Sequence, residues 1–176
     1  NRGKPGVDGV TFRDIEKNGL EAWIESISKM LRDRTYVPKP VKRVYIPKPD
    51  GGQRPLGIPS ICDRVVQAAC KIVIEPIFEA LFNENSYGYR PGRSAADAVT
   101  VIGKSIKQGF VHVLDADLSG YFDNIPHDRL MDKIARHISD TSMLALMRKF
   151  LRAPVAETTS SGKTCIKRTG KGTPQG

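Results

Sequence analysis

Residues 111–125 read VHVLDADLSGYFDNI, and this stretch decides the fold. It overlaps a short apolar run, Phe110–Leu114, which is typical of a buried strand. Asp115 and Asp117 follow at once, and the two-residue period of an extended chain places both carboxylates on one face. Carboxylate oxygens in that position suit Mg²⁺. Acidic residues also favour the turn after a strand, and the spacing alone favours this second interpretation.

The rest of the chain indicates helices and two hairpins. Helices are expected at 20–34, from the N-cap Ser60 to 82 with a pause near Pro76, at 94–108, at 126–138 and at 140–151. Hairpins are expected from 41–46 with 53–58, and from 155–159 with 164–169. Residues 1–11 are rich in Gly and Pro and indicate turns. Because strands and helices do not alternate regularly, the sequence predicts an α+β fold.

The chain is basic, with 28 Lys and Arg against 19 Asp and Glu and a formal net charge of +9. Such an excess favours a polyanionic partner, which is either nucleic acid or an anionic membrane surface. No run approaches the ~18 apolar residues of a membrane-spanning helix. Cys62, Cys70 and Cys165 are too widely spaced for a zinc site or a disulfide framework, which indicates reduced thiols in a cytoplasmic protein.

The stretch from Asp117 to Ile125, followed by Pro-His127-Asp128-Arg-Leu130, resembles polymerase motif A of bacterial reverse transcriptases. Four further blocks resemble the group II intron type of these enzymes, in the correct order. They are GVDGVT at 6–11 (N-terminal extension), IPKPDGGQRPLGIP at 46–59 (fingers hairpin), FNENSYGYRPGRS at 82–94, and GTPQG at 172–176 (start of motif B). Each block is weak by itself, but five in order across residues 6–176 identify the chain as a member of this family.

The resemblance implies a role for residues of motif A. It assigns the catalytic, metal-binding position to Asp117 rather than Asp115, with Mg²⁺ as the cofactor. The main-chain carbonyl of Leu118 is implied as a further metal ligand. Phe122 matches the bulky residue that excludes a ribose 2′-hydroxyl and so selects deoxynucleotides. Asp123 and Asn124 are expected to be structural.

The resemblance also implies a nucleotide site. Lys48 and Arg54 would hold the β- and γ-phosphates, a role that suits a point charge and a planar guanidinium fork. Gln175 would flank the sugar. Without the resemblance, Lys48 and Arg54 are ordinary charges of a solvated hairpin.

Further basic residues are expected to contact template, primer or intron RNA, although a solvated face is the competing interpretation. These residues are Lys42, Arg43, Arg90, Arg93, Lys163 and Lys167. Tyr87 is expected to pin its loop onto the core rather than stack on bases. His127 is expected to cap or orient the turn after motif A.

The implied domains are the fingers (1–85), a palm portion with motif A (86–124), helices and a hairpin that return to the fingers (125–168), and the start of motif B (169–176). The implied reaction is RNA-directed DNA synthesis, with an RNA template, intron RNA, a DNA primer and a deoxynucleotide as partners and no membrane. The sequence neither requires nor excludes a homo-oligomer. Alternatives are an RNA-binding maturase module without polymerase activity, or a CRISPR-associated or diversity-generating relative.

The family's Tyr-x-Asp-Asp motif C, which carries the remaining catalytic carboxylates, does not occur in these 176 residues. Both ends of the chain look cut. A single Asp does not hold two Mg²⁺ ions tightly. We therefore expect the 176-residue chain by itself to be inactive as a polymerase and to bind Mg²⁺ weakly.

Overall fold

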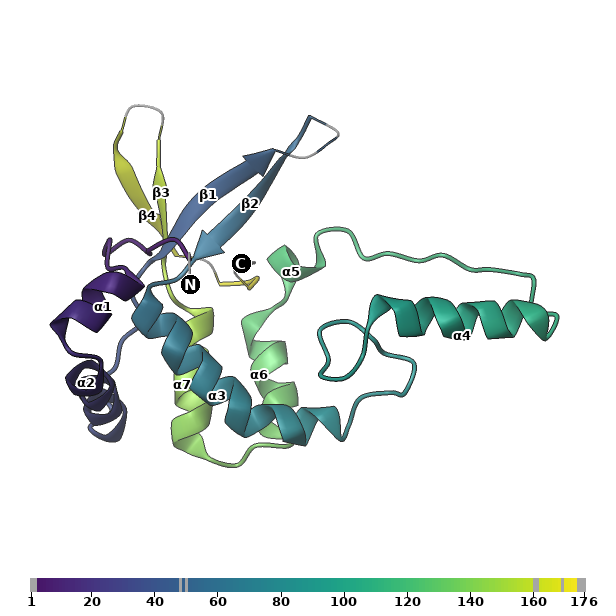
Figure 1. Cartoon of the computed structure of the whole chain (residues 1–176), viewed down its shortest axis with the longest axis horizontal. Coiled ribbons are helices and arrows are strands. Elements are labelled where there is room, and N and C mark those ends of the chain that lie inside the picture. The colour runs from purple at the N-terminus through teal and green to yellow at the C-terminus, as the bar shows by residue number, and fades with distance from the viewer. Residues whose placement is uncertain (1–2, 48, 50, 160–161, 169, 174–176) are drawn as a thin grey trace. The chain divides into compact units, whose positions relative to one another are not determined.

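The structure is a computed structural model that describes residues 3–47, 49, 51–159, 162–168 and 170–173. The chain divides into two compact units (Figure 1). The first contains Asn1–Cys70 and Gly120–Gly176, and the second contains Lys71–Ser119. Each unit is described by itself below.

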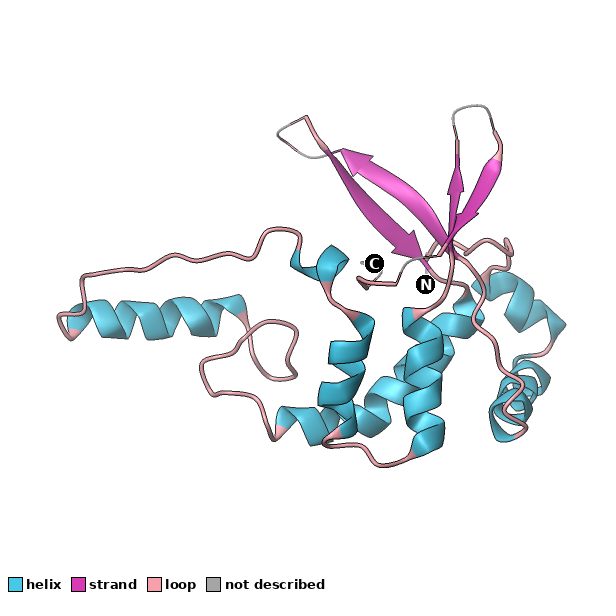
Figure 2. Cartoon of the chain, turned by 180° about the vertical axis from the view of Figure 1, so that it is seen from behind, coloured by secondary structure: helices cyan, strands magenta, loops and turns pink. Residues whose placement is uncertain are grey.

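A four-stranded sheet belongs to the first unit. Its strands are β1 (Val41–Pro47), β2 (Gln53–Ile58), β3 (Val155–Thr158) and β4 (Thr164–Lys167), in the order β2-β1-β3-β4. β1 and β2 are antiparallel, and so are β3 and β4, which confirms both predicted hairpins. β1 and β3 pair in parallel, with Val41 opposite Val155. Figure 2 shows the two hairpins diverging from the end at which β1 and β3 meet.

The first unit contains several helices and a small apolar core. These helices are α1 (Phe12–Asn18), α2 (Leu20–Arg32), the first part of α3 (Ile61–Glu79), α5 (Tyr121–Asn124), α6 (His127–Ala135) and α7 (Thr141–Leu151). Ile27, Tyr36 and Val66 form the buried centre of this core, and Trp23 and Phe150 pack against it. The core therefore joins α2, α3 and α7.

The sequence analysis missed α1, which begins after Thr11. The Thr11 hydroxyl accepts a hydrogen bond from the Asp14 backbone N–H, and the Asp14 carboxylate accepts one from the Thr11 backbone N–H. This reciprocal pattern is a capping box. Gly19 ends α1 and precedes α2 with a φ of 100°. The Thr-x-x-Asp spacing was the signal for this helix, but the Gly and Pro residues before it favoured a turn.

Helix α3 begins as predicted at Ser60, whose hydroxyl accepts from the Asp63 N–H at 3.1 Å. Asp63 is buried and also accepts hydrogen bonds from the Tyr36 hydroxyl at 2.6 Å and the Lys39 backbone N–H at 3.2 Å. The predicted pause near Pro76 is wrong, because α3 is continuous to Glu79. A proline removes one helical hydrogen bond, and this helix continues past that loss.

The second unit contains the rest of α3, a loop and α4 (Ala95–Lys107). Ser94 and Asp97 form a capping box at the predicted start of α4. The buried strand expected at Phe110–Leu114 is wrong, since residues 110–118 have no regular secondary structure and Leu114 is 93% exposed. A strand needs a partner for its backbone hydrogen bonds, and all four described strands pair in the sheet of the first unit.

The mixed α+β architecture predicted from the sequence is confirmed. Among the residues that the structure describes, no helix combines the length and apolar character needed to cross a bilayer.

Candidate functional site

The second half of motif A forms a short helical turn, α5, in the first unit. Gly120 precedes it in the left-handed conformation, with φ 58° and ψ 31°. The Asn124 side-chain amide donates to the Gly120 carbonyl at 3.0 Å and closes the turn. The rings of Tyr121 and Phe122 meet edge to face at 5.5 Å, and both side chains are exposed. The turn thus presents Phe122 on an open surface.

Residues 171–173, which include the first two residues of the predicted motif B block at 172–176, are bound to this turn. The backbone N–H of Gly172 donates to the Ile125 carbonyl, and that of Thr173 donates to the Phe122 carbonyl, both at 2.8 Å. The Nε2 atom of the buried His127 lies 2.7 Å from the Gly172 carbonyl oxygen. Each of these three hydrogen bonds joins residues that lie at least 45 positions apart in sequence.

Glycine is required at position 172. Its φ is +83°, and a Cβ atom there would lie 2.7 Å from the backbone oxygen of Asp123. Beside it, the Lys171 ammonium donates to the Asn124 side-chain oxygen at 2.8 Å. Asn124 therefore serves both the turn and the docked segment, which agrees with the structural role expected for it. The sequence identified both segments, but it carried no signal for the contact between them.

The sheet carries Lys42, Arg43 and Arg54. Lys42 lies opposite Ile58, and Arg54 lies opposite Ile46 near the far end of the β1–β2 hairpin, where its side chain is exposed. Arg43 is half-buried on β1. Lys48 and Gln175 lie outside the described residues, so the predicted Lys48–Arg54 pair and the place of Gln175 beside Phe122 stay predictions.

The second hairpin carries Lys163 and Lys167. Lys163 is exposed at the turn, whereas the Lys167 ammonium lies 2.7 Å from the Glu157 carboxylate. This hydrogen bond raises the pKa of Lys167 and lowers that of Glu157. The Tyr45 hydroxyl also donates to Glu157, which links β1 to β3. The charge of Lys167 is partly compensated within the protein, so Lys163 is the freer of the two for an external anion.

In the second unit, the Arg90 guanidinium forms hydrogen bonds within its own loop and with the end of α3. Its guanidinium donates to the Glu79 carboxylate at 2.6 Å and to the carbonyls of Asn83 at 2.7 Å and Ser86 at 2.8 Å. It also lies over the Phe82 ring, and the Arg90 side chain is only 6% exposed. The hydrogen bond from Arg90 lowers the pKa of Glu79. Arg90 therefore holds the loop in shape and presents little of its guanidinium to a nucleic acid.

Arg93 follows the same pattern more weakly. One of its guanidinium nitrogens donates to the Glu84 carbonyl at 2.7 Å, and the group lies 5.6 Å from the centre of the Tyr87 ring. Tyr87 is half-buried and thus fixes part of the loop. The neighbouring Tyr89 is fully exposed with a φ of 58°.

Asp115, Asp117 and Leu118 lie in the irregular segment of the second unit, where all three are exposed. The two carboxylates are the right chemical type for Mg²⁺. Across the described ranges, however, no group of three or more His, Cys, Asp or Glu side chains is placed to hold a metal. Asp117 thus supplies one fitting ligand, and the described residues do not complete a metal site around it.

Comparison with known proteins identifies the family. Residues 46–176 match the reverse transcriptase (RNA-dependent DNA polymerase) family. The chain is 41% identical to "Protein YkfC" of Escherichia coli K12 over 157 residues, which are 85% of this chain and 40% of that protein. It is 40% identical to "Group II intron-encoded protein LtrA" of Lactococcus lactis over 160 residues, which are 89% of this chain and 25% of LtrA.

A third relative, an uncharacterized 91 kDa protein in the cob intron of Schizosaccharomyces pombe, is 39% identical over 130 residues, 74% of this chain and 16% of that protein. The chain thus spans between about one sixth and two fifths of the length of these relatives. The matched residues include the motif A turn, the fingers hairpin from Ile46 and the docked segment 171–173. The chain belongs to the reverse transcriptase family, among relatives of the group II intron-encoded type.

Proposed function

We propose that the complete protein is an RNA-directed DNA polymerase of the group II intron type. The observation that carries this proposal is the family match over residues 46–176, which contains Asp117 and Phe122 at the spacing of motif A. The reaction is nucleotidyl transfer, in which a primer 3′-hydroxyl attacks the α-phosphate of a deoxynucleotide and pyrophosphate leaves. Bound Mg²⁺ ions would lower the pKa of the attacking hydroxyl and neutralise charge on the leaving group.

The chain's own residues would bind and position the reactants. Asp117 would be a metal ligand through its carboxylate, and Leu118 through its carbonyl oxygen. Arg54 and Lys48 would hold the triphosphate, where their charges offset those of the phosphate oxygens. Positioning of this kind supplies much of the rate enhancement in phosphoryl transfer.

Sugar selection would take place at the motif A turn. Phe122 is exposed there, and its carbonyl is bound by Thr173. Gln175 would flank the same sugar, as the family resemblance implies. The docked segment would hold the motif A turn, and with it Phe122, in a fixed position.

We assign residues 1–85 to the fingers, 86–124 to a palm portion, 125–168 to elements that return to the fingers and 169–176 to the start of motif B. The pairing of β3 with β1 supports the third assignment. RNA template, DNA primer and deoxynucleotide are the proposed partners, and the names of the relatives support intron RNA as a further one. The 176-residue chain by itself is proposed to be inactive, because the Tyr-x-Asp-Asp motif that supplies the family's remaining catalytic carboxylates does not occur in it.

Primer extension on an RNA template by the complete protein tests the polymerase and its sugar selection together. The wild-type protein should extend with deoxynucleotides and discriminate against ribonucleotides. Phe122→Ala should keep extension with deoxynucleotides and lose most of the discrimination. The control is Tyr89→Ala, which removes a fully exposed ring outside motif A and should leave the discrimination unchanged. Absence of any extension would overturn the polymerase proposal.

The second candidate is an RNA-binding maturase module without polymerase activity. The relatives encoded within introns and the net charge of +9 favour RNA binding in either case. The two candidates differ in whether the protein needs Asp117 for its activity: a polymerase does, and a maturase module does not. Intron splicing that survives Asp117→Ala, in a protein that never extends a primer, would favour the maturase.

A further inference from the structure

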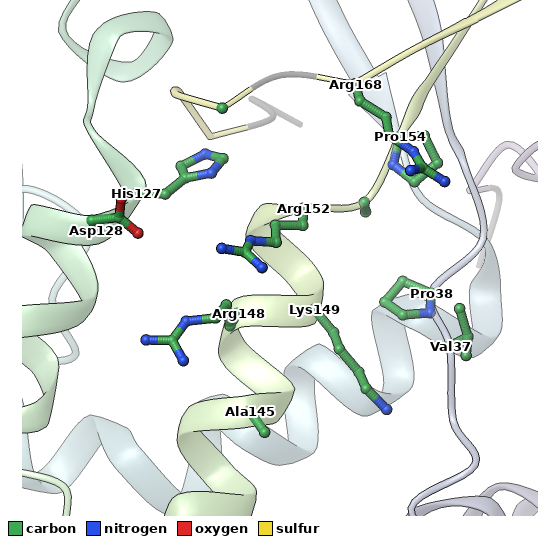
Figure 3. A pocket seen from close by; sticks show the side chains of 12 residues that line it. Val37, Pro38, His127, Asp128, Ala145, Arg148, Lys149, Arg152, Pro154 and Arg168 are labelled. Carbon is green, nitrogen blue, oxygen red and sulfur yellow. The ribbon is translucent and has the colours of Figure 1, made fainter.

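A basic pocket of the first unit has no role in the assignments above. It has a volume of about 740 Å³ and lies at the start of α6, the last turn of α7 and the end of β4 (Figure 3). Four of the residues that line it are cations, namely Arg148, Lys149, Arg152 and Arg168. Asp128 is the one carboxylate among the lining residues. The walls of the pocket therefore carry a clear excess of positive charge.

Three of the four cations are free to bind a ligand. Arg148, Arg152 and Arg168 are exposed, and their side chains form no hydrogen bond or ion pair with another residue in the described part of the chain. Figure 3 shows Arg148 and Arg152 extending from the same side of α7, whereas Arg168 enters beside Pro154. By contrast, Arg90 has almost all its hydrogen-bonding capacity in use.

Lys149 has a different role. Its ammonium donates to the Tyr36 carbonyl at 2.6 Å and approaches the Arg34 carbonyl at 3.4 Å. These bonds tie α7 to the segment after α2, and Figure 3 shows the side chain pointing away from Arg148 and Arg152. Lys149 therefore fixes the wall of the pocket and leaves the three arginines to bind.

The arrangement is unfavourable unless an anion fills it. Arg148 and Arg152 lie one helical turn apart, and like charges at that spacing destabilise a helix. A helix C-terminus tolerates cations because of its dipole, which accounts for Arg148 in the last turn of α7 and for Arg152 directly after it. It does not account for Arg168, a third cation that lines the same pocket from beyond the end of β4. Guanidinium groups bind phosphate oxygens as planar forks, so three of them from two elements suit several phosphates.

We propose that this pocket binds the backbone phosphates of a single-stranded RNA segment. Its volume exceeds what one phosphate fills, and the apolar side chains of Val37, Pro38 and Pro154 in its wall suit sugars and bases. Only the choice of RNA as the natural polyanion rests on the proposed function. The residues that line the pocket include neither Asp117 nor any residue of the fingers hairpin. Neither Arg148 nor Arg152 was expected from the sequence to bind RNA.

Binding of an unstructured oligouridylate to the complete protein, measured over a range of salt concentrations, tests the site. Arg148→Gln/Arg152→Gln should weaken binding about tenfold at moderate salt. It should also lower the slope of log affinity against log salt by about 1.4, since each phosphate contact with a single strand contributes roughly 0.7. Arg148→Lys/Arg152→Lys should keep most of that slope because it retains both charges. Retained binding in this variant also shows that substitution at these two positions does not unfold the site.

The matched control is Arg129→Gln/Lys133→Gln. It removes two exposed cations one turn apart on α6, neither of which lines the pocket. This pair should change affinity and slope much less than the α7 pair. If both double variants lose the same amount of affinity, the effect comes from net charge alone, and the proposed RNA site is wrong.

The same variants separate RNA from a free nucleotide. If Arg148→Gln/Arg152→Gln raises the KM for deoxynucleotide and leaves oligouridylate binding intact, the pocket takes a triphosphate and the RNA proposal is wrong. If no variant extends a primer but the α7 pair alone loses RNA binding, the polymerase proposal fails and the RNA site stands.

Discussion

The Nε2 atom of His127 lies 2.7 Å from the carbonyl oxygen of Gly172, and His127 is 5% exposed. Because a carbonyl only accepts, Nε2 carries the proton and donates it. The bond fixes residues 171–173 on the motif A turn, together with the N–H groups of Gly172 and Thr173. In the proposed enzyme, His127 is a positioning residue for the wall of the sugar pocket.

His127→Ala should leave the buried Gly172 carbonyl without its donor. An unpaired buried polar group costs about 1–3 kcal/mol, so the free energy of unfolding should fall by about that amount. Urea denaturation measures the loss, and hydrogen exchange should be faster at the Thr173 amide. Arg129→Ala, an exposed residue of the same helix, is the control and should change neither. Unchanged exchange at Thr173 in His127→Ala would show that the bond does not hold the segment.

Gly172→Ala should lower the stability of the protein more than the same change at another glycine of positive φ. At Gly172 the new Cβ would lie 2.7 Å from the Asp123 backbone oxygen, whereas at Gly162, with φ +80°, no atom lies within 4 Å. In both variants an alanine must adopt a left-handed backbone conformation, which costs roughly 1–2 kcal/mol. The difference in stability between the two variants therefore measures the clash of the new Cβ with the Asp123 oxygen. Equal melting temperatures for the two variants would contradict the observed close approach.

Tyr36 makes stability sensitive to high pH. Burial and the hydrogen bond to Asp63 raise the pKa of Tyr36 far above its ordinary value. The stabilisation is complete below about pH 10, the pKa of an unfolded tyrosine. Above that pH the unfolded chain releases a proton that the folded chain keeps, so stability falls.

Tyr36→Phe should therefore flatten the decline in stability above about pH 10. At neutral pH the variant should be less stable by roughly 1.5–3 kcal/mol, typical of a hydrogen bond to a charged group. Denaturation at neutral and alkaline pH measures both effects. Tyr89→Phe is the control, because Tyr89 is fully exposed. If the stability of Tyr36→Phe falls as steeply at alkaline pH as that of the wild type, other titrating groups cause the decline.

The loop after α3 should depend on the geometry of Arg90 and not on its charge alone. Arg90→Lys keeps the charge but not the planar fork that reaches Glu79, Asn83 and Ser86 together. Backbone amides at 83–93 should exchange faster in Arg90→Lys, almost as fast as in Arg90→Ala. Arg13→Lys, on exposed α1, is the control. Wild-type exchange in Arg90→Lys would show that charge suffices.

The Glu79–Arg90 pair also predicts sensitivity to acid. The hydrogen bond from Arg90 lowers the pKa of Glu79, so the stabilisation is complete at neutral pH. It is lost as the pH falls through that lowered pKa, because the folded carboxylate must then take up a proton. Protease cleavage within 83–93 should therefore increase on acidification in the wild type and change less in Glu79→Gln.

Local signals in the sequence predicted most elements, although they missed α1 and wrongly suggested a pause at Pro76. Contacts between distant segments could not be predicted. The turn at Gly51 and Gly52 predicted the first hairpin, and Ser60 and Ser94 predicted helix starts, since each signal acts within a few residues. The apolar run at 110–114 led to the wrong prediction of a strand, because a strand depends on a partner that its own residues do not specify. The pairing of Val41 with Val155 is likewise non-local.

The candidate site followed the same rule. The order of the motifs identified the family and selected Asp117 over Asp115. The sequence did not show that His127 binds Gly172, or that Arg168 lines the same pocket as Arg148 and Arg152, because each relationship involves residues at least 16 positions apart. Arg90 matched its motif, yet its loop uses the guanidinium internally.

The assignment of Asp117 is tested most directly by primer extension on an RNA template with the complete protein and two variants. Asp117→Ala should abolish DNA synthesis and leave RNA binding largely intact. Asp115→Ala removes a carboxylate two residues away in the same exposed segment, and it should retain synthesis. Synthesis that survives Asp117→Ala, or that is lost only in Asp115→Ala, would contradict the account.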